Sequence, residues 1–415
     1  MNTKTFQAMP LQSFSVRGQW WRPSFENDKL PGVLHFDSDN GLKLLLDGAF
    51  DMLHATMDNH QEETIFGRTA NGTIYSLLKC GYAGKTVGNS FLNDIPRCTE
   101  MNYRPALALK GILITSLEEP VFFSLELEFS HTAKWLDHSL VREDYSTRQF
   151  TIENAFEKGL GTLDSIAVTL HAEAHATGWN AFEPKREHSF TITQQNGFTC
   201  LSTTSLSIVA WLKFVARLQR FLSFATRQAV YPVNIYNGES PDLQVSAPSR
   251  DVIVDIFYKT YAVHAEREPS YYEMLIPFSA LGSNCADILG RWQTIEDHLP
   301  DIIDLYLGNI FADKINPTFY FLSMAQSLES FHRILRPGKP MTTDEFQALR
   351  GRVLANLTQD DGEWLRARFP QNEKFYATRL GPVVNSATPW PQPGGHRRGN
   401  CGPACRSGSR CPAIA

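Results

Sequence analysis

Residues 316–335 read NPTFYFLSMAQSLESFHRIL and give the strongest helix signal in the sequence. Asn316 suits the N-cap position, Pro317 suits the first helical position, and Pro337 stops the run. Apolar side chains recur at spacings of three and four and form one stripe, made of Phe321, Ala325, Leu328, Phe331 and Leu335. The pattern predicts a helix with one apolar face.

A second face of this predicted helix is polar. Gln326, Glu329 and Arg333 share it, and His332 lies at its border with the apolar stripe. Histidine titrates near neutral pH, and a carboxylate one turn away can exchange a proton with it. Glu329 and His332 are therefore either an acid–base pair or the hydrogen-bonded edge of a packed core.

The composition bounds the class of protein. With 415 residues the chain is long enough for two domains, and its 42% hydrophobic and 20% charged residues are typical of a soluble globular protein. The net charge of −5 gives no global reason to expect nucleic acid, although a local patch could bind it. There is no secretory signal pattern and no long apolar run, so we expect a cytoplasmic protein without membrane contact.

Cysteine usage indicates reduced thiols rather than a disulfide framework. Four cysteines are widely scattered: Cys80, Cys98, Cys200 and Cys285. The other three, Cys401, Cys405 and Cys411, follow His396 in a stretch rich in Pro, Gly and Arg, and their spacing fits no common zinc motif. We therefore expect no metal and no cofactor. The segment 386–415 is either a disordered tail or a stretch read out of frame.

The first two thirds of the chain carry mainly strand signals. Residues 123–129 alternate between apolar and polar side chains, as in a half-buried strand. Shorter runs of this kind occupy 32–36, 42–46, 73–78, 166–170 and 189–193, with Asn-Gly turn signals at 40–41, 71–72 and 196–197. One predicted helix, 205–227, interrupts them, and its basic side either meets phosphate or is solvated. We assign residues 1–275 to an antiparallel β-rich domain with one inserted helix.

Helical periodicity dominates after residue 275. Helices are predicted at 286–299, with a break at Pro300, at 316–335, at 342–357, and more weakly at 363–369 and 373–384. We therefore expect an α+β protein in which residues 276–385 form a C-terminal helical bundle, incomplete at its end.

Two further motifs each have two interpretations. The segment from Gly81 to Thr86 is similar to a phosphate-binding loop but lacks its first glycine, so a loop between strands is the alternative. His171, Glu173 and His175 would share one face of a strand, either as metal ligands or as an exposed polar surface.

The N-terminal half carries Gln19-Trp20-Trp21-Arg22-Pro23, then Gly32-Val33-Leu34-His35-Phe36, Leu44-x-Leu46-x-Gly48 and Ile65-Phe66-Gly67. In these segments the chain resembles the ApeA family of bacterial anti-phage proteins. The C-terminal half resembles the HEPN domain of that family through Trp292 and Leu328-Glu329-x-x-His332-Arg333. The resemblance covers roughly residues 15 to 385.

This resemblance implies an abortive-infection ribonuclease. HEPN nucleases typically dimerise and cut RNA without metal, through an Arg-x₄₋₆-His motif late in the bundle. The histidine moves the proton of a ribose 2′-hydroxyl, and the arginine stabilises charge on the phosphorane. The implied partners are an RNA substrate, a phage-derived trigger sensed by the N-terminal domain, and a second copy of the chain.

The sequence departs from this motif. Its one match inside the predicted bundle runs from Arg291 to His298, on the first helix, and the alternative is two unrelated surface residues. We therefore expect a protein of the ApeA type whose catalytic motif is lost through truncation or a frameshift near Asn385. Glu329, His332 and Arg333 would then support an active site rather than perform the chemistry. A non-catalytic binding module for the trigger, or a structural remnant, are the alternatives.

Overall fold

The computed structural model forms two compact units, Met1–Leu335 and Arg336–Ala415. It describes residues 13–37, 40–50, 62–89, 96–144, 146–147, 149–177, 191–237, 253–260, 269–312, 316–335 and 343–363.

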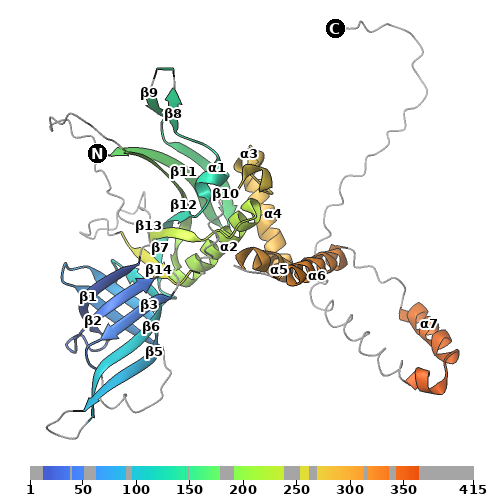
Figure 1. Ribbon diagram of the computed structural model, residues 1–415, viewed down its shortest axis with the longest axis horizontal. Helices are drawn as coiled ribbons and strands as arrows, with labels where there is room; N and C mark the ends of the chain where they lie inside the picture. Colours follow the sequence, from blue (N-terminus) through green and yellow to red (C-terminus); the bar gives the residue numbers. More distant parts are fainter. Residues whose placement is uncertain are drawn as a thin grey trace. The chain divides into compact units, whose positions relative to one another are not determined.

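Six antiparallel strands of the first unit close into a ring within the described residues (Figure 1). They are β1 (Phe14–Trp21), β2 (Leu30–Asp37), β3 (Gly41–Leu46), β4 (Glu63–Thr69), β5 (Ile74–Asn89) and β6 (Pro96–Lys110). β1 pairs with β2 and β4, β2 with β3, and β4 with β5, and the ring closes because β6 pairs with both β3 and β5. We call this element the strand ring.

The inside of the strand ring is a packed apolar core. It is built from Trp20, Leu34, Phe36, Leu42, Leu44, Leu46, Ile65, Tyr75, Leu77 and Tyr103 with their neighbours. Gly67 is needed here because a Cβ atom on it would lie 2.2 Å from Cζ3 of the fully buried Trp20. Burial raises the pKa of Tyr75 to about 12, with Asp255 adding to the shift.

An open sheet continues from the ring. The same edge of β6 that pairs with β3 pairs further along with β14 (Asp255–Tyr258). The sheet then proceeds through β13 (Pro232–Asn237), β7 (Pro120–Phe129), β12 (Thr191–Ser207), β11 (Ile166–Thr177) and β10 (Phe156–Leu163). β8 (Val141–Asp144) and β9 (Gln149–Ile152) form a separate hairpin. The predicted antiparallel N-terminal region is confirmed.

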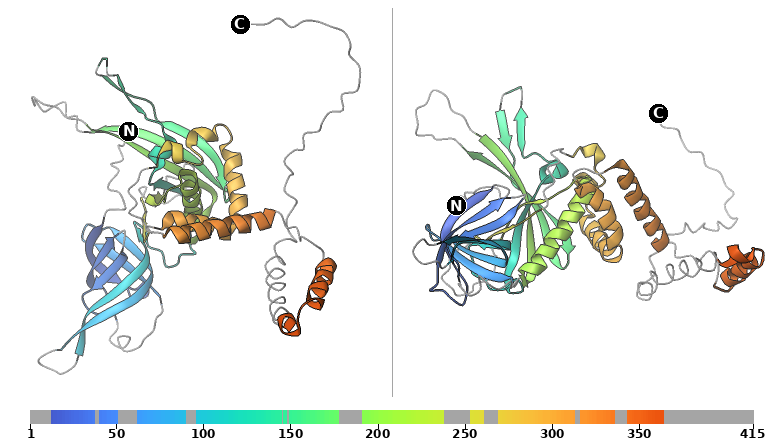
Figure 2. Two further views of the ribbon diagram at one scale, coloured as in Figure 1. Left: turned by 45° about the vertical axis from the view of Figure 1, so that its right-hand side comes forward. Right: turned by 60° about the horizontal axis from the view of Figure 1, so that its bottom comes forward.

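Helices cover one face of the open sheet (Figure 2). α2 (Ile208–Thr226) begins at Ser207, whose hydroxyl accepts a hydrogen bond from the backbone N–H of Ala210, and it packs on β7 and β12. α1 (Thr132–Leu136) packs beside β12. The predicted helix at 205–227 is therefore confirmed, although it begins three residues later.

The helices that follow share this core. The short helices are η2 (Tyr271–Glu273) and α3 (Phe278–Leu281), and the longer ones are α4 (Cys285–His298) and α5 (Pro300–Phe311). Leu289, Trp292 and Leu307 lie in the same apolar cluster as the open sheet. Pro300 opens α5, as predicted, because it lacks the N–H that would continue α4. The domain boundary at 275/276 stays a prediction.

One of the three predicted Asn-Gly turns was wrong. Asn40-Gly41 and Asn71-Gly72 do lie at the ends of hairpins, where Gly41 and Gly72 have positive φ angles. Asn196-Gly197, in contrast, lies inside β12. Glycine is favoured at this position because the His171 side chain lies close to the backbone of β12. A Cβ atom on Gly197 would lie 2.8 Å from Nε2 of His171.

The segment from Gly81 to Thr86 is not a loop between strands. It lies inside β5 and pairs with β6, and the element that follows β5 is the strand β6. A phosphate-binding loop of the expected kind opens a helix, so this segment does not provide one.

The second unit contains α7 (Thr343–Ala355), which agrees with the helix predicted at 342–357. The predicted helix at 363–369 lies outside the described residues except for Glu363. The predicted helix at 373–384 and the segment 386–415 lie wholly outside them.

Candidate functional site

The helix α6 (Pro317–Leu335) has the predicted start. Oδ1 of Asn316 accepts a hydrogen bond from the backbone N–H of Thr318 at 2.9 Å, and the Asn316 carbonyl accepts one from the N–H of Tyr320. Asn316 therefore caps the first turn, and Pro317 occupies the position where a missing N–H costs nothing.

A polar face of α6 packs against α5. Ser327 is 5% exposed, and the Ser323 hydroxyl donates a hydrogen bond of 2.7 Å to Oδ1 of Asn309 on α5. Nδ2 of Asn309 in turn donates to the carbonyl of Leu305. Small serine side chains let the two helices approach closely, and the buried amide is satisfied.

The apolar stripe of α6 lies away from this contact and is exposed. Phe321 is 69% exposed and Leu328 64% exposed, and Phe331 is also exposed, while Met324 is half-buried between them. We call these four residues the α6 stripe. An apolar helix face of this size normally packs on a neighbour. The stripe is therefore an interface candidate and not part of the first unit's core.

The predicted polar group of α6 lies next to this stripe. Glu329 and His332 are both exposed, and Arg333 follows one residue later on the same helix. Helical geometry places Glu329 and His332 roughly opposite the serine face that contacts α5. They are therefore accessible, and their supporting role stays a prediction.

The other predicted pair lies on α4, and its members have separate partners. Arg291 forms an ion pair of 2.9 Å with Asp287 one turn earlier. Nδ1 of His298 lies 2.7 Å from the backbone carbonyl of Thr294. Both side chains are exposed, and they lie seven residues apart on one helix, so about 10 Å separates them along its axis. Catalysis by this pair also stays a prediction.

The two central arginines on the basic side of α2 are occupied by carboxylates. Arg217 forms ion pairs with Asp164, with Asp297 at 2.5 Å and with Glu296 at 3.1 Å. Arg220 binds the second oxygen of Glu296 at 2.6 Å and Asp304 at 2.6 Å. These partners come from the β10–β11 turn, α4 and α5. Arg217 and Arg220 therefore fasten elements together instead of binding phosphate.

Glu296 is the centre of this network, and the sequence analysis missed it. It is 8% exposed, and burial raises the pKa of its carboxyl. The positive charges of Arg220 and Arg217 lower this pKa and offset part of the shift. The available signal was its position, because Glu296 follows Leu289 and Trp292 at the spacing of the buried face of α4. A carboxylate on such a face requires a cation opposite.

The polar face of β11 is hydrogen-bonded to its neighbours. Nδ1 of His171 lies 3.3 Å from the Thr199 hydroxyl on β12, and that hydroxyl donates to Glu126 on β7 at 3.0 Å. Burial lowers the pKa of His171. Glu173 lies 3.4 Å from His175. In the part of the chain that the structure describes, no three His, Cys, Asp or Glu side chains are placed to hold a metal ion.

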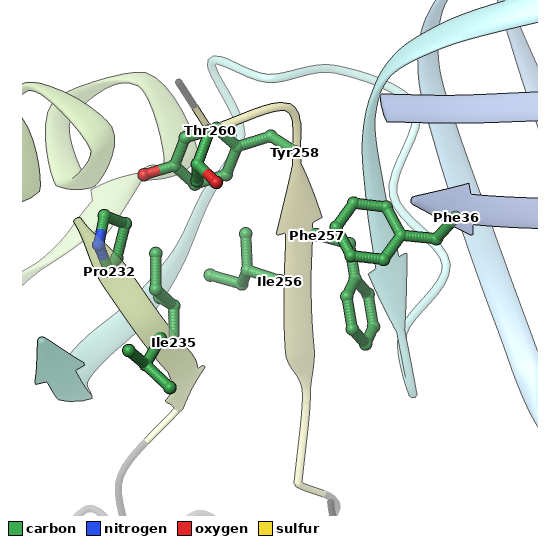
Figure 3. Close-up of a pocket in the computed structure, with 8 residues that line it drawn as sticks. Phe36, Pro232, Ile235, Ile256, Phe257, Tyr258 and Thr260 are labelled. Carbon is green, nitrogen blue, oxygen red and sulfur yellow. The ribbon is translucent and has the colours of Figure 1, made fainter. Parts of the chain in front are cut away.

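A small cavity lies where β13 and β14 separate (Figure 3). The two strands pair only through Tyr236 and Asp255, and apolar side chains such as Ile235, Ile256 and Phe257 line the gap. Its volume is about 20 Å³. Such a space holds about one water molecule, so it is too small for a trigger ligand.

Among the described helices, none is long and apolar enough to cross a membrane.

These features define an α+β protein in which a strand ring and an open antiparallel sheet carry a C-terminal set of helices. A family model described as ApeA N-terminal domain 1 matches residues 15–292, more than half of the chain, and the chain belongs to this family. The match begins in β1 and ends at Trp292 in α4. No curated protein and no solved structure matches the chain. Membership in this family associates the chain with anti-phage defence.

Proposed function

We propose that the chain is a cytoplasmic anti-phage defence protein of the ApeA type, with a HEPN-like helical part of the kind that cuts RNA in intact members of the family. The family match over residues 15–292 carries this proposal. The order of elements supports it, because α4 to α6 follow the sheet domain directly. RNA is the proposed target because its 2′-hydroxyl supplies the nucleophile that a histidine can deprotonate without a metal ion.

In this chain we propose that RNA cleavage is impaired. The one Arg-x₄₋₆-His match between residues 276 and 385 is Arg291 to His298. Arg291 forms an exposed ion pair with Asp287, and Nδ1 of His298 lies 2.7 Å from the backbone carbonyl of Thr294. The two side chains are not arranged around a common point at which a phosphate would react.

The alternative is a binding module that recognises a phage-derived trigger without cutting RNA. The occupied side chains of Arg291 and His298 favour it. The family match also favours it, because that match describes an N-terminal domain and ends in α4.

We also propose that the protein acts as a homodimer through its helical part. The exposed α6 stripe supports this assembly, since a second α6 would bury it. Glu329 and His332 border the stripe. In such a dimer they would lie at the seam between two copies, where they could support a site formed by both.

The proposal is tested in infected cells. Host ribosomal and transfer RNA is followed by gel electrophoresis during phage infection, in cells that produce the chain or carry an empty vector. We expect the same RNA profile in both. RNA degradation that requires the chain, and that disappears with His298→Ala, would overturn the impairment and establish α4 as catalytic.

A further inference from the structure

The outer face of the strand ring carries one basic residue on each of five successive strands. They are Arg104 on β6, Lys43 on β3, His35 on β2, Arg17 on β1 and Arg68 on β4. Their neighbours in sequence, such as Tyr103, Leu44 and Leu34, lie in the ring core, so these five side chains are on the opposite face. We call them the basic row.

The strand register makes the row continuous. Lys43 is directly opposite His35, and Arg104 follows Tyr103, the register partner of Leu44, so it is next to Lys43. Such direct neighbours have Cβ atoms about 5 Å apart.

Two diagonal steps complete the row. Arg17 is opposite Val33, two residues from His35 along β2, and Arg68 is opposite Gln19, two residues from Arg17 along β1. Diagonal neighbours on a sheet lie about 7–8 Å apart, so the whole row spans about 25 Å.

The charges of the row are available for a ligand. Arg17, Lys43, Arg68 and Arg104 are exposed, and none of them has an ion pair within the described residues. Two carboxylates lie on the same face beside the row, Asp37 on β2 and Asp47 just after β3. Asp37 already accepts a hydrogen bond from the backbone N–H of Asn40 in the β2–β3 turn.

We propose that the basic row binds the phosphate backbone of a single-stranded nucleic acid. Cations in a line at these spacings can contact successive phosphates of one strand, and such contacts give sequence-independent, salt-sensitive binding. Among the apolar side chains on this face, Val33 and Leu45 are half-buried, and Trp21 and Phe66 are buried with their rings against each other. They offer no exposed anchor of the kind that holds protein partners. The row lies on the strand ring and is independent of any cleavage by the helices.

The test measures binding of the full chain to a labelled single-stranded DNA by fluorescence anisotropy across a salt series. DNA is used because it lacks the 2′-hydroxyl, so cleavage of the kind proposed above does not interfere. The charge-reversed variant Arg17→Glu/Arg68→Glu is compared with Lys213→Glu/Arg352→Glu. The second variant makes the same change in net charge at exposed positions outside the row, and thermal melting confirms that both are folded.

We expect the row variant to bind at least about tenfold more weakly, with a salt slope reduced by about 1.4, because two phosphate contacts are lost. The control variant should bind within about twofold of the wild type. Equal weakening in both variants, or no binding by the wild type at low salt, would overturn the proposal. Row-dependent binding of an acidic peptide without binding of DNA would also overturn it, in favour of a protein partner.

Discussion

At the scale of single residues, Arg217 has more charged partners than any other side chain in the ion pairs of the described residues. It neutralises Glu296, whose carboxyl is buried, and it also binds Asp164 and Asp297. Because these three carboxylates belong to the β10–β11 turn and α4, one guanidinium fastens α2 to two other elements. A buried carboxylate that loses such a cation is left with a large desolvation cost.

We predict that Arg217→Met lowers the free energy of unfolding by about 2 kcal/mol at neutral pH, since Arg220 still partly neutralises Glu296. The raised pKa of Glu296 sets the pH dependence. Its protonated form is favoured in the folded state, so the associated stability is present at acid pH and is lost as pH rises through the folded-state pKa. The penalty of Arg217→Met should therefore shrink on acidification.

Urea denaturation followed by circular dichroism at several pH values measures this effect. Lys213→Met is the matched control, because Lys213 is an exposed cation on the same helix without an ion pair in the described residues. If Arg217→Met lowers the free energy of unfolding only as much as Lys213→Met does, or if its effect grows as pH falls, Arg217 does not stabilise the fold by neutralising Glu296.

Two glycines give a second prediction at this scale. Gly67→Ala should destabilise the protein by about 3 kcal/mol, because its Cβ would lie 2.2 Å from the buried ring of Trp20. Gly290→Ala should instead stabilise by up to about 1 kcal/mol, because Gly290 is a helical residue with open space around its Cβ position. Thermal melting of both variants measures these changes in stability. If the two substitutions shift the melting temperature similarly, Gly67 is not packed against Trp20 as described.

At the scale of elements, α6 uses its polar face for the contact within the first unit and leaves its apolar face exposed. Phe321, Met324, Leu328 and Phe331 follow one another at spacings of three, four and three. This is the spacing of a helix that packs along another helix. Ala325 lies between the stripe and Glu329 and carries no charge, so small apolar surface continues the stripe on that side.

We predict that Leu328→Glu weakens self-association at least about tenfold, because it places a charge in the centre of the α6 stripe. The matched control is Gln326→Glu, which adds the same charge to an exposed position on another face of the helix. Sedimentation equilibrium measures the dissociation constant. If both variants associate as the wild type does, or if the wild type is a monomer throughout, the proposed dimer interface is incorrect.

At the scale of the whole molecule, local signals predicted the elements and long-range pairing decided their arrangement. The cap at Asn316 and the break at Pro300 follow from the chemistry of single residues, so the sequence located both. Closure of the strand ring depends on β6 pairing with two strands at once, for which no local pattern exists.

The candidate site was predictable to the same limited extent. Three members of the α6 stripe, Phe321, Leu328 and Phe331, follow from helical periodicity, as do the neighbouring Glu329 and His332, whereas Met324 was not predicted. That α6 would use its serine face against α5 depends on the position of Asn309, which the periodicity of α6 does not contain. The periodicity of α4 does indicate that Glu296 is buried, but its arginine partners on α2 follow only from the tertiary structure.

The central claim is that this chain has the ApeA-type N-terminal fold but no working catalytic pair in α4. It is tested most directly by incubating the purified chain with RNA in the presence of a chelator and measuring the fraction of full-length RNA over time. We predict that the wild type and His298→Ala leave the RNA equally intact. Cleavage by the wild type that proceeds with the chelator and is lost in His298→Ala would contradict the claim.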